Sequence, residues 1–279
     1  MILMKLKSYS KINLSLRVLN KLKNGMHNIE SNAVLTNLFD EIYLEKNKKD
    51  LVVFKGKFKN KINKKTNSVS KTLKILRELN VIDKFYKITI KKNIPVFAGL
   101  GGGTGNAVSI VKYFFKNQIN GKLTKIFEKQ IGSDFRLFLN NFSFQQNLKK
   151  ISKNKNNFNF HLVVVYPFIK CETKLIYKIN KNYSSSSGKS YLKKHSYNKF
   201  IEMLKSDKND LQKTVEKKHI KIAKLIKSIS EQKNCIFSRL TGSGSACYGV
   251  FKSKKTAKLA SMNLKRKYPK YWCAVTKTI

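Results

Sequence analysis

The spacing of hydrophobic and polar residues predicts mainly strands in the first part of the chain. Four stretches have the alternating or continuous apolar pattern of strands: residues 2–18, 29–45, 51–54 and 86–91. Acidic residues fall within and after the second stretch, where we expect a turn and a solvated face: Asp40, Glu41, Glu45 and Asp50. Helical spacing at 68–79 and 107–115 predicts two helices, the first capped by Asn67.

Strands and helices also alternate in the second part of the chain. Apolar runs predict strands at 161–166, 235–240, 246–251 and 272–276. Helical spacing predicts one helix over 211–229 and another over 255–267. The natural interpretation of this order is β-α-β-β-α-β, so we predict the fold class α+β.

Length and composition indicate a folded chain of two domains. With 279 residues and about 150 residues per domain, there is room for two, and a weakly apolar tract at 151–160 is the best boundary. We therefore expect domains at 1–155 and 156–279, with a flexible Ser-rich loop at 183–190. No uncharged apolar run approaches the roughly 20 residues of a membrane span, so we expect a soluble protein without a membrane partner.

The charge bears on which partner the protein binds, and the cysteine content bears on its redox environment. The net charge is +44, yet only five of the 59 basic residues are Arg, the residue favoured for bidentate phosphate and base contacts. We interpret the scattered Lys as drift towards A/T-rich codons rather than a nucleic-acid surface, although the charge favours anionic substrates. The four Cys are widely spaced and form no C-x-x-C motif, which indicates free thiols in a reducing cytoplasm.

A glycine-rich cluster at 98–106 is the strongest functional motif. Five glycines fall within residues 99–105, between a predicted strand and a predicted helix, and Thr104 adds a hydroxyl. Glycines let backbone N–H groups approach a ligand, and the start of a helix favours phosphate. The cluster has neither the ending of a Walker A loop nor the spacing of the dinucleotide fingerprint. It therefore predicts a phosphate site of another type.

Local sequence leaves alternatives open for the other candidates. A second small-residue turn is equally a hairpin or a further nucleotide contact: Thr241, Gly242, Ser243 and Gly244. Asp134 is suited either to cap a helix or to act in catalysis. Lys11 lies within an apolar strand, where a lone Lys usually faces solvent, and local evidence favours a structural role for His27. The spacing of the His residues gives no support for a zinc site.

Six segments occur together in a recognisable order: residues 10–14, 25–27, 67–69, 95–103, 132–134 and 238–244. This set resembles the GHMP kinases, and within them the 4-diphosphocytidyl-2-C-methyl-D-erythritol kinase family. The resemblance implies a ribosomal-protein-S5-domain-2-like N-terminal domain and a ferredoxin-like C-terminal domain. It also implies a cytoplasmic enzyme of isoprenoid precursor biosynthesis by the non-mevalonate route, with ATP and Mg²⁺ as cofactors, acting as a monomer or a homodimer.

The implied reaction transfers the γ-phosphate of ATP to the 2-hydroxyl of the cytidyl substrate. Asp134 matches the aspartate that takes the hydroxyl proton, and Lys11 matches the cation that offsets transition-state charge. ATP contacts are implied at Asn67, Lys92, Pro95, Val96, Phe97, Ala98, Gly99, Leu100, Gly101, Gly102, Gly103, Thr104 and Gly105, with Thr104 near the metal. Substrate contacts are implied at Asn13, Met26, His27, Thr173 and Tyr177. His27 would bind the cytosine edge and Tyr177 would stack on its face.

Several positions depart from the family pattern. Met26 stands where Tyr is usual, which leaves one aromatic face for cytosine and predicts weaker binding. A Thr104-Gly105 pair replaces Ser-Ser. A Phe135-Arg136 pair replaces an apolar-Pro pair after Asp134, and 140–142 lacks the usual glycine.

Two other functions remain as alternatives. Another GHMP kinase would act on a small alcohol such as mevalonate or homoserine, but His27 and Tyr177 suit a pyrimidine better. An RNA-binding protein on the same fold would use the positive charge. It would have no need for Lys11, the glycine cluster and Asp134 together.

Overall fold

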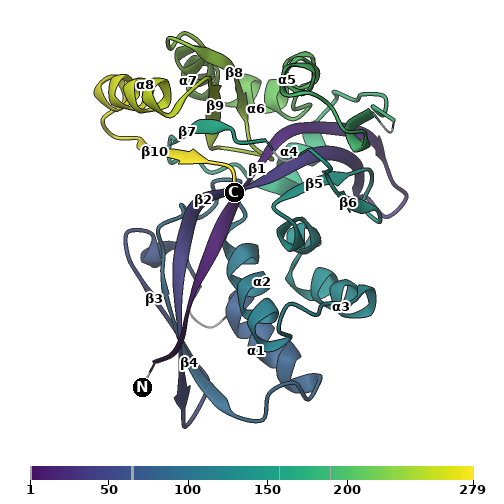
Figure 1. The fold of residues 1–279 in the computed structure, drawn as a ribbon, viewed down its shortest axis with the longest axis vertical. Coiled ribbons are helices and arrows are strands. Elements are labelled where there is room, and N and C mark those ends of the chain that lie inside the picture. Colours follow the sequence, from purple (N-terminus) through teal and green to yellow (C-terminus); the bar gives the residue numbers. More distant parts are fainter. Residues whose placement is uncertain (1, 64–65, 157, 189) are drawn as a thin grey trace. The chain divides into compact units, whose positions relative to one another are not determined.

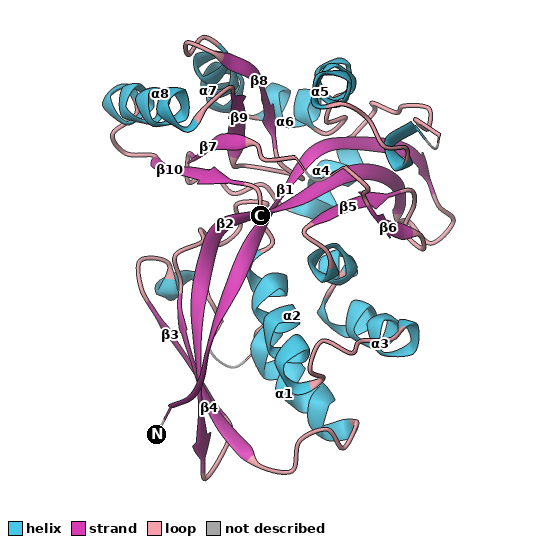
Figure 2. Ribbon diagram, viewed as in Figure 1, coloured by secondary structure: helices cyan, strands magenta, loops and turns pink. Residues whose placement is uncertain are grey.

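The computed structural model describes residues 2–63, 66–156, 158–188 and 190–279. The chain forms two compact units whose segments alternate along the sequence. The first unit comprises residues 1–11, 38–96 and 101–140, and the second comprises 12–37, 97–100 and 141–279. Both contain strands and helices, which confirms the α+β class (Figure 2). The predicted boundary between two domains at residue 155 stays a prediction. Each compact unit is built from several segments of the chain and not from one continuous half.

The first unit packs helices against a small sheet (Figure 1). It contains the part of the long strand β1 (Ile2–Lys21) up to residue 11 and the part of β2 (His27–Asn47) from residue 38 onwards. Strand β2 pairs antiparallel with β4 (Phe85–Lys91), and β4 pairs in parallel with β3 (Leu51–Lys55). The remaining elements are η1 (Lys59–Lys61), α1 (Ser68–Glu78), α2 (Gly102–Phe114), α3 (Gly121–Ile131) and the 3₁₀ helix η2 (Ser133–Leu139). The predicted strands and the first helix are therefore confirmed.

Helix α1 shows how the sequence pattern becomes structure. Asn67 caps it by accepting hydrogen bonds from the backbone N–H groups of Val69 and Ser70, as predicted. Val69, Leu73 and Leu76 recur at helical spacing, and all three are buried. Helix α1 packs against α2 through this apolar face.

The predicted turn at Asp40 and Glu41 is wrong, because strand β2 runs through both residues to Asn47. Asp40 shares the inward face of the strand with Ile42 and Leu44, and its side chain is fully buried. Hydrogen bonds satisfy its carboxylate, so the charge does not force the chain out to solvent. Glu45 pairs with Lys87 at the surface, which fits the predicted solvated face.

The second unit contains two groups of strands. Residues 31–34 of β2 pair with β5 (Phe142–Gln145), and β5 pairs with β6 (Ile151–Lys153). A separate antiparallel sheet has the order β10 (Trp272–Lys277), β7 (His161–Tyr166), β9 (Cys247–Phe251) and β8 (Cys235–Leu240). Helices α7 (Ile220–Ser230) and α8 (Lys254–Lys267) pack against this sheet and complete the predicted β-α-β-β-α-β order. The other elements are α4 (Thr173–Ile179), η3 (Ser190–Leu192), α5 (Tyr197–Ser206) and α6 (Gln212–Lys218).

Two helix predictions need correction. The helix expected over 211–229 is two helices, because His219 has a non-helical backbone (φ −139°, ψ 81°) that separates α6 from α7. Helix α2 begins at Gly102 rather than at 107. The low helix propensity of glycine hides this start in the sequence.

The cysteines are free thiols, as their spacing predicts. All four cysteines are free, and burial raises the pKa of the Cys171 thiol to about 11. Within the described ranges, no helix is long and apolar enough to cross a bilayer.

Candidate active site

The second half of the glycine cluster begins helix α2 in the first unit. Gly101 has φ 67°, and a Cβ there would lie 2.6 Å from the Phe138 ring and 3.1 Å from the Lys11 side chain. A Cβ on Gly105 would lie 2.9 Å from the Tyr9 carbonyl oxygen. Glycine is therefore required at both positions by close packing. The first turn of α2 contains no acidic residue, so its backbone N–H groups and the helix dipole favour an anion.

The start of α1 lies against the start of α2. The Ser68 hydroxyl donates a hydrogen bond of 2.7 Å to the Gly103 carbonyl oxygen. Asn67, for which an ATP contact is implied, uses its side-chain oxygen to cap α1. Thr104 is half-buried in the first turn of α2. Two helix N-termini therefore meet beside the glycines, which strengthens the case for a phosphate site.

Lys11 and Asp134 lie together in the first unit. The Lys11 Nζ is 3.2 Å from Oδ2 of Asp134. The Lys11 side chain is only 5% exposed, whereas that of Asp134 is 39% exposed. The solvent-facing alternative for Lys11 is therefore wrong. The capping alternative for Asp134 is also wrong, because Gly132 occupies the cap position of η2. A buried ammonium thus faces a carboxylate that a ligand can reach.

Aromatic packing holds the turn that carries Asp134. Phe135 is buried, and its ring stacks on that of Phe127 with centroids 5.2 Å apart. Arg136 forms an ion pair with Glu128 of α3. These contacts fix the turn that follows Asp134.

A buried polar cluster, which the sequence did not reveal, lies beneath the start of α2. Lys92 Nζ donates to Oδ2 of Asp40 and, at 3.0 Å, to Oδ1 of Asn106. Burial lowers the pKa of Lys92, and the charge of Asp40 opposes this effect. The ammonium of Lys92 is therefore paired inside the unit, and the ATP contact implied for it stays a prediction.

Asp40 also holds the backbone that leads into the glycine cluster. Its Oδ1 accepts hydrogen bonds from the N–H groups of Asn93 (2.7 Å) and Ile94 (2.9 Å), just before Pro95 and Val96. Asn106 Nδ2 donates to Asp40 and to the Ser8 hydroxyl. One carboxylate thus links the residues before the cluster with helix α2. The only sequence signal was an acid at an inward position of an alternating strand.

The first half of the cluster, residues 97–100, belongs to the second unit and packs on the other glycine turn. A Cβ on Gly99 would lie 2.6 Å from the Thr241 carbonyl oxygen and 3.0 Å from that of Gly244. The Ala98 carbonyl oxygen accepts a hydrogen bond of 3.1 Å from the Ala246 N–H. Leu100 is buried, whereas Phe97 is 56% exposed at a positive φ of 60°. Within the second unit, residues 97–100 and the second glycine turn are therefore neighbours.

The second glycine turn also gathers predicted substrate residues. The Thr241 hydroxyl accepts a hydrogen bond of 3.1 Å from the Asn13 N–H, and Asn13 Nδ2 donates to the Ser31 hydroxyl. The hydroxyls of Thr173 and Ser243 are 2.9 Å apart. Asn209 donates to the Gly242 carbonyl oxygen and steadies the turn. The second unit thus places Asn13, Thr173 and this turn in one network.

The side chains of His27 and Tyr177 form an aromatic pair in the second unit. The rings of His27 and Tyr177 have centroids 5.2 Å apart and are inclined by 36°. Burial lowers the pKa of His27, and the nearby charge of Lys21 adds to this effect. Its imidazole is therefore neutral at pH 7 and has one donor and one acceptor nitrogen. Met26 beside it is 46% exposed.

Within the part of the chain that the structure describes, no three His, Cys, Asp or Glu residues gather as they would around a metal ion. A magnesium ion bound through a nucleotide needs few protein ligands, because phosphate oxygens and water supply most of them.

Family models and individual relatives point to the same family of proteins. Residues 67–129 match the model of the GHMP kinases N terminal domain, and 189–270 match that of GHMP kinases C terminal. A 4-diphosphocytidyl-2-C-methyl-D-erythritol kinase of Pelagibacter ubique is 35% identical over 282 residues, which cover 99% of each chain. A kinase of the same name from Caldanaerobacter subterraneus is 28% identical and covers 99% of this chain and 97% of its own.

Solved structures agree on the fold. A crystal structure of 4-(cytidine 5'-diphospho)-2C-methyl-D-erythritol kinase matches with a TM-score of 0.75 and 18% identity, covering 99% of this chain and 100% of the other. Homoserine kinase from Cytophaga hutchinsonii matches with a TM-score of 0.63 and 16% identity, covering 99% of this chain and 94% of its own. At these identities the matches show the fold alone.

Proposed function

We propose that this chain, which belongs to the 4-diphosphocytidyl-2-C-methyl-D-erythritol kinase family of the GHMP kinases, transfers the γ-phosphate of ATP to the 2-hydroxyl of that cytidyl alcohol. The Lys11–Asp134 pair at 3.2 Å is the observation that carries the proposal. It supplies a base and a cation to a chain whose glycine-rich helix start is suited to phosphate. The alternative of an RNA-binding protein gives no role to this pair.

Each group has a definite part in the proposed transfer. The Asp134 carboxylate accepts the proton of the substrate hydroxyl while the oxygen of that hydroxyl forms a bond to the γ-phosphorus. The bond from that phosphorus to the β–γ bridging oxygen breaks, and ADP leaves with the electron pair. Lys11 offsets negative charge on the transferring group, and the N–H groups at the start of α2 hold the phosphates. Positioning and charge, rather than a covalent intermediate, lower the barrier.

Magnesium fits this donor set without a dedicated protein site. The Thr104 hydroxyl in the first turn of α2 is the residue we propose as its protein ligand, and phosphate oxygens provide the others. When bound, the ion neutralises charge on the β- and γ-phosphates.

The second unit is proposed to recognise the cytidyl group. Neutral His27 offers a donor and an acceptor to the cytosine edge, while the Tyr177 ring provides a face for stacking. Asn13, Thr173 and the turn from Thr241 to Gly244 offer further polar contacts.

Tyr177→Ala tests the stacking role. Base stacking on an aromatic ring contributes about 1–3 kcal/mol, so we expect KM for the cytidyl substrate to rise roughly 5- to 150-fold with little change in kcat. Tyr183→Ala is the matched control, since Tyr183 is 47% exposed in the same unit. An unchanged KM in Tyr177→Ala, measured by steady-state ADP release, would count against the stacking role.

The pH dependence of KM tests the role of His27. Burial lowers the His27 pKa below its usual 6.5, so the ring stays neutral at pH 7 and gains a proton only in more acidic solution. Protonation removes its acceptor nitrogen. We expect KM for the cytidyl substrate to rise as the pH falls below 6.5, and the same profile in His27→Gln to be flat. Parallel profiles for the two proteins would exclude this role.

The product itself tests the proposed reaction. Wild-type protein, ATP, Mg²⁺ and the cytidyl alcohol should give one new phosphomonoester, which ³¹P and ¹³C NMR place on the oxygen of carbon 2. Mevalonate and homoserine serve as competing alcohols. Phosphorylation of either one in preference to the cytidyl alcohol would replace this proposal by another GHMP kinase activity.

We also propose that the enzyme works in the cytoplasm, in keeping with its free thiols. We propose that it acts as a monomer or a homodimer, and sedimentation measurement distinguishes the two.

A further inference from the structure

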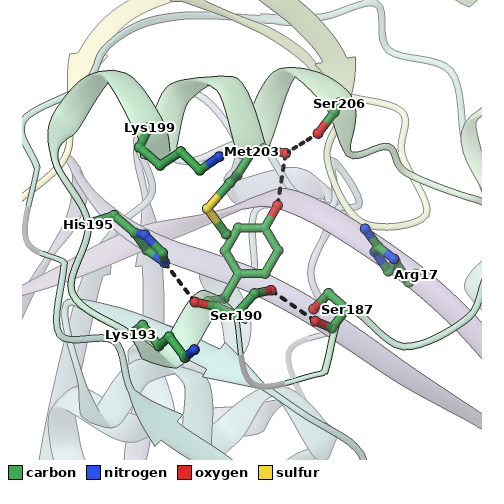
Figure 3. Close-up of a pocket in the computed structure, with 9 residues that line it drawn as sticks. Arg17, Ser187, Ser190, Lys193, His195, Lys199, Met203 and Ser206 are labelled. Atoms are coloured by element: carbon green, nitrogen blue, oxygen red, sulfur yellow. Dashed lines mark hydrogen bonds between the residues drawn. The ribbon is translucent and has the colours of Figure 1, made fainter.

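A cationic cavity of about 560 Å³ lies in the second unit, and its described lining includes none of the residues assigned to catalysis or cytosine recognition. Figure 3 shows Lys199 and Met203 on helix α5 at one side, with Lys193 and His195 on the loop below and Arg17 on strand β1 opposite. Among the described residues, none that lines the cavity is acidic, and the carboxylates of Glu30 and Asp207 pair with Arg17 behind it. Three separate segments of a single unit therefore direct positive side chains towards one hollow.

Two buried carboxylates, Asp207 and Glu30, fix the wall of the cavity from behind. Asp207 accepts hydrogen bonds from Arg17 Nε (2.9 Å) and from the Tyr191 hydroxyl (2.8 Å). The Tyr191 hydroxyl also lies 3.0 Å from the Met203 carbonyl oxygen, which ties the wall to α5. Burial raises the pKa of Tyr191, so its hydroxyl stays protonated in this role. The cavity is therefore preformed by buried contacts.

The donors that remain for a ligand are charged ones. The serine hydroxyls of the lining donate within the protein, with Ser187 bonding Glu30 and Ser206 bonding the Met203 carbonyl oxygen. Lys193 and Lys199 are exposed, and among the described residues no carboxylate pairs with either ammonium group. Ammonium and guanidinium groups bind phosphate oxygens by charge-assisted hydrogen bonds. The thioether of Met203 adds an adaptable apolar surface to the same cavity.

We propose that this cavity binds a small phosphorylated metabolite, with its phosphate between Lys193 and Lys199 and its apolar part against Met203. The volume lies within the range of about 300–1,000 Å³ that small-molecule sites occupy. A nucleic-acid strand fits less well, because Tyr191, the aromatic residue of the lining, is buried and offers no open face for stacking bases. This ligand would be additional to ATP and the alcohol substrate.

Methyl NMR of the full chain tests the proposal directly. The chain has five Met, and ¹³C-methyl labelling gives a separate signal for Met203, assigned with Met203→Leu. The probe is phenyl phosphate, compared with inorganic phosphate, at constant ionic strength. We expect a saturable shift of the Met203 signal, at lower concentrations of phenyl phosphate than of inorganic phosphate. Met26 reports separately on the proposed substrate site, so the result does not depend on kinase activity.

A pair of charge-matched variants separates a defined site from general positive charge. Lys193→Ala with Lys199→Ala should weaken phenyl phosphate binding at least tenfold. Lys255→Ala with Lys258→Ala, on the exposed side of α8, removes the same charge and should leave binding within twofold. The other methionine signals verify that both proteins are folded. An unmoved Met203 signal, or equal weakening in both variants, overturns the proposal. A single-stranded oligonucleotide that moves Met203 at lower concentration than phenyl phosphate overturns the ligand class.

Discussion

Asp134→Asn is expected to lower kcat by about 10²–10⁴-fold, the usual contribution of a positioned general base. The amide keeps the shape of the side chain but cannot take the hydroxyl proton. Asp134 is 39% exposed and its turn is held by Phe135, so the variant should fold normally. The affinity for ATP should change little, because the phosphates are proposed to bind the start of α2.

Asp83→Asn is the matched control for this experiment. Asp83 is an exposed acid of the same unit, outside the proposed site. Its variant should retain wild-type kcat in the same ADP-release assay. A loss of less than tenfold in Asp134→Asn, with an unchanged unfolding midpoint, would mean that Asp134 is not the base.

Asp40→Ala should destabilise the protein by about 3–5 kcal/mol, since removing one partner leaves a buried charge uncompensated. The Lys92 ammonium loses its ion pair, and the N–H groups of Asn93 and Ile94 lose their acceptor. The free energy of unfolding in urea measures this effect. Activity at low temperature should also fall, because the same carboxylate holds the backbone before the glycine cluster.

Two further variants make the Asp40 result specific. Asp50→Ala breaks a partly exposed pair with Arg77, and we expect a cost of no more than about 1 kcal/mol. Asp40→Leu combined with Lys92→Met removes both charges and should recover part of the lost stability, although the two N–H groups stay without their acceptor. A loss below 1 kcal/mol in Asp40→Ala would contradict the role given to this cluster.

Strands and helices were predictable where burial follows a simple period. The alternation of Tyr86, Ile88 and Ile90 in β4 and the spacing of Leu73 and Leu76 in α1 are direct consequences of one buried face. Prediction from the hydrophobic pattern failed at two positions, where tertiary contacts or the backbone depart from the pattern. Asp40 is charged but satisfied inside the fold, and His219 interrupts what reads as one amphipathic helix.

Some parts of the candidate site could be predicted from local sequence and others could not. The glycine content alone predicted a phosphate site. The structure adds that close packing at Gly101 and Gly105 admits no side chain. The pairing of Lys11 with Asp134 joins residues far apart in the sequence, and only the resemblance to known kinases suggested it. The cluster around Asp40 had no such guide, since its partners come from three separate segments.

ADP release by the wild-type protein with ATP and Mg²⁺ is the decisive test of the proposed kinase activity. It is run with the full cytidyl alcohol and with the same substrate lacking its cytidyl group. We expect turnover with the first and little or none with the second, because His27 and Tyr177 are proposed to bind the base that holds the alcohol in place. Equal turnover with both substrates, or none with the folded wild-type protein, would contradict the proposed function.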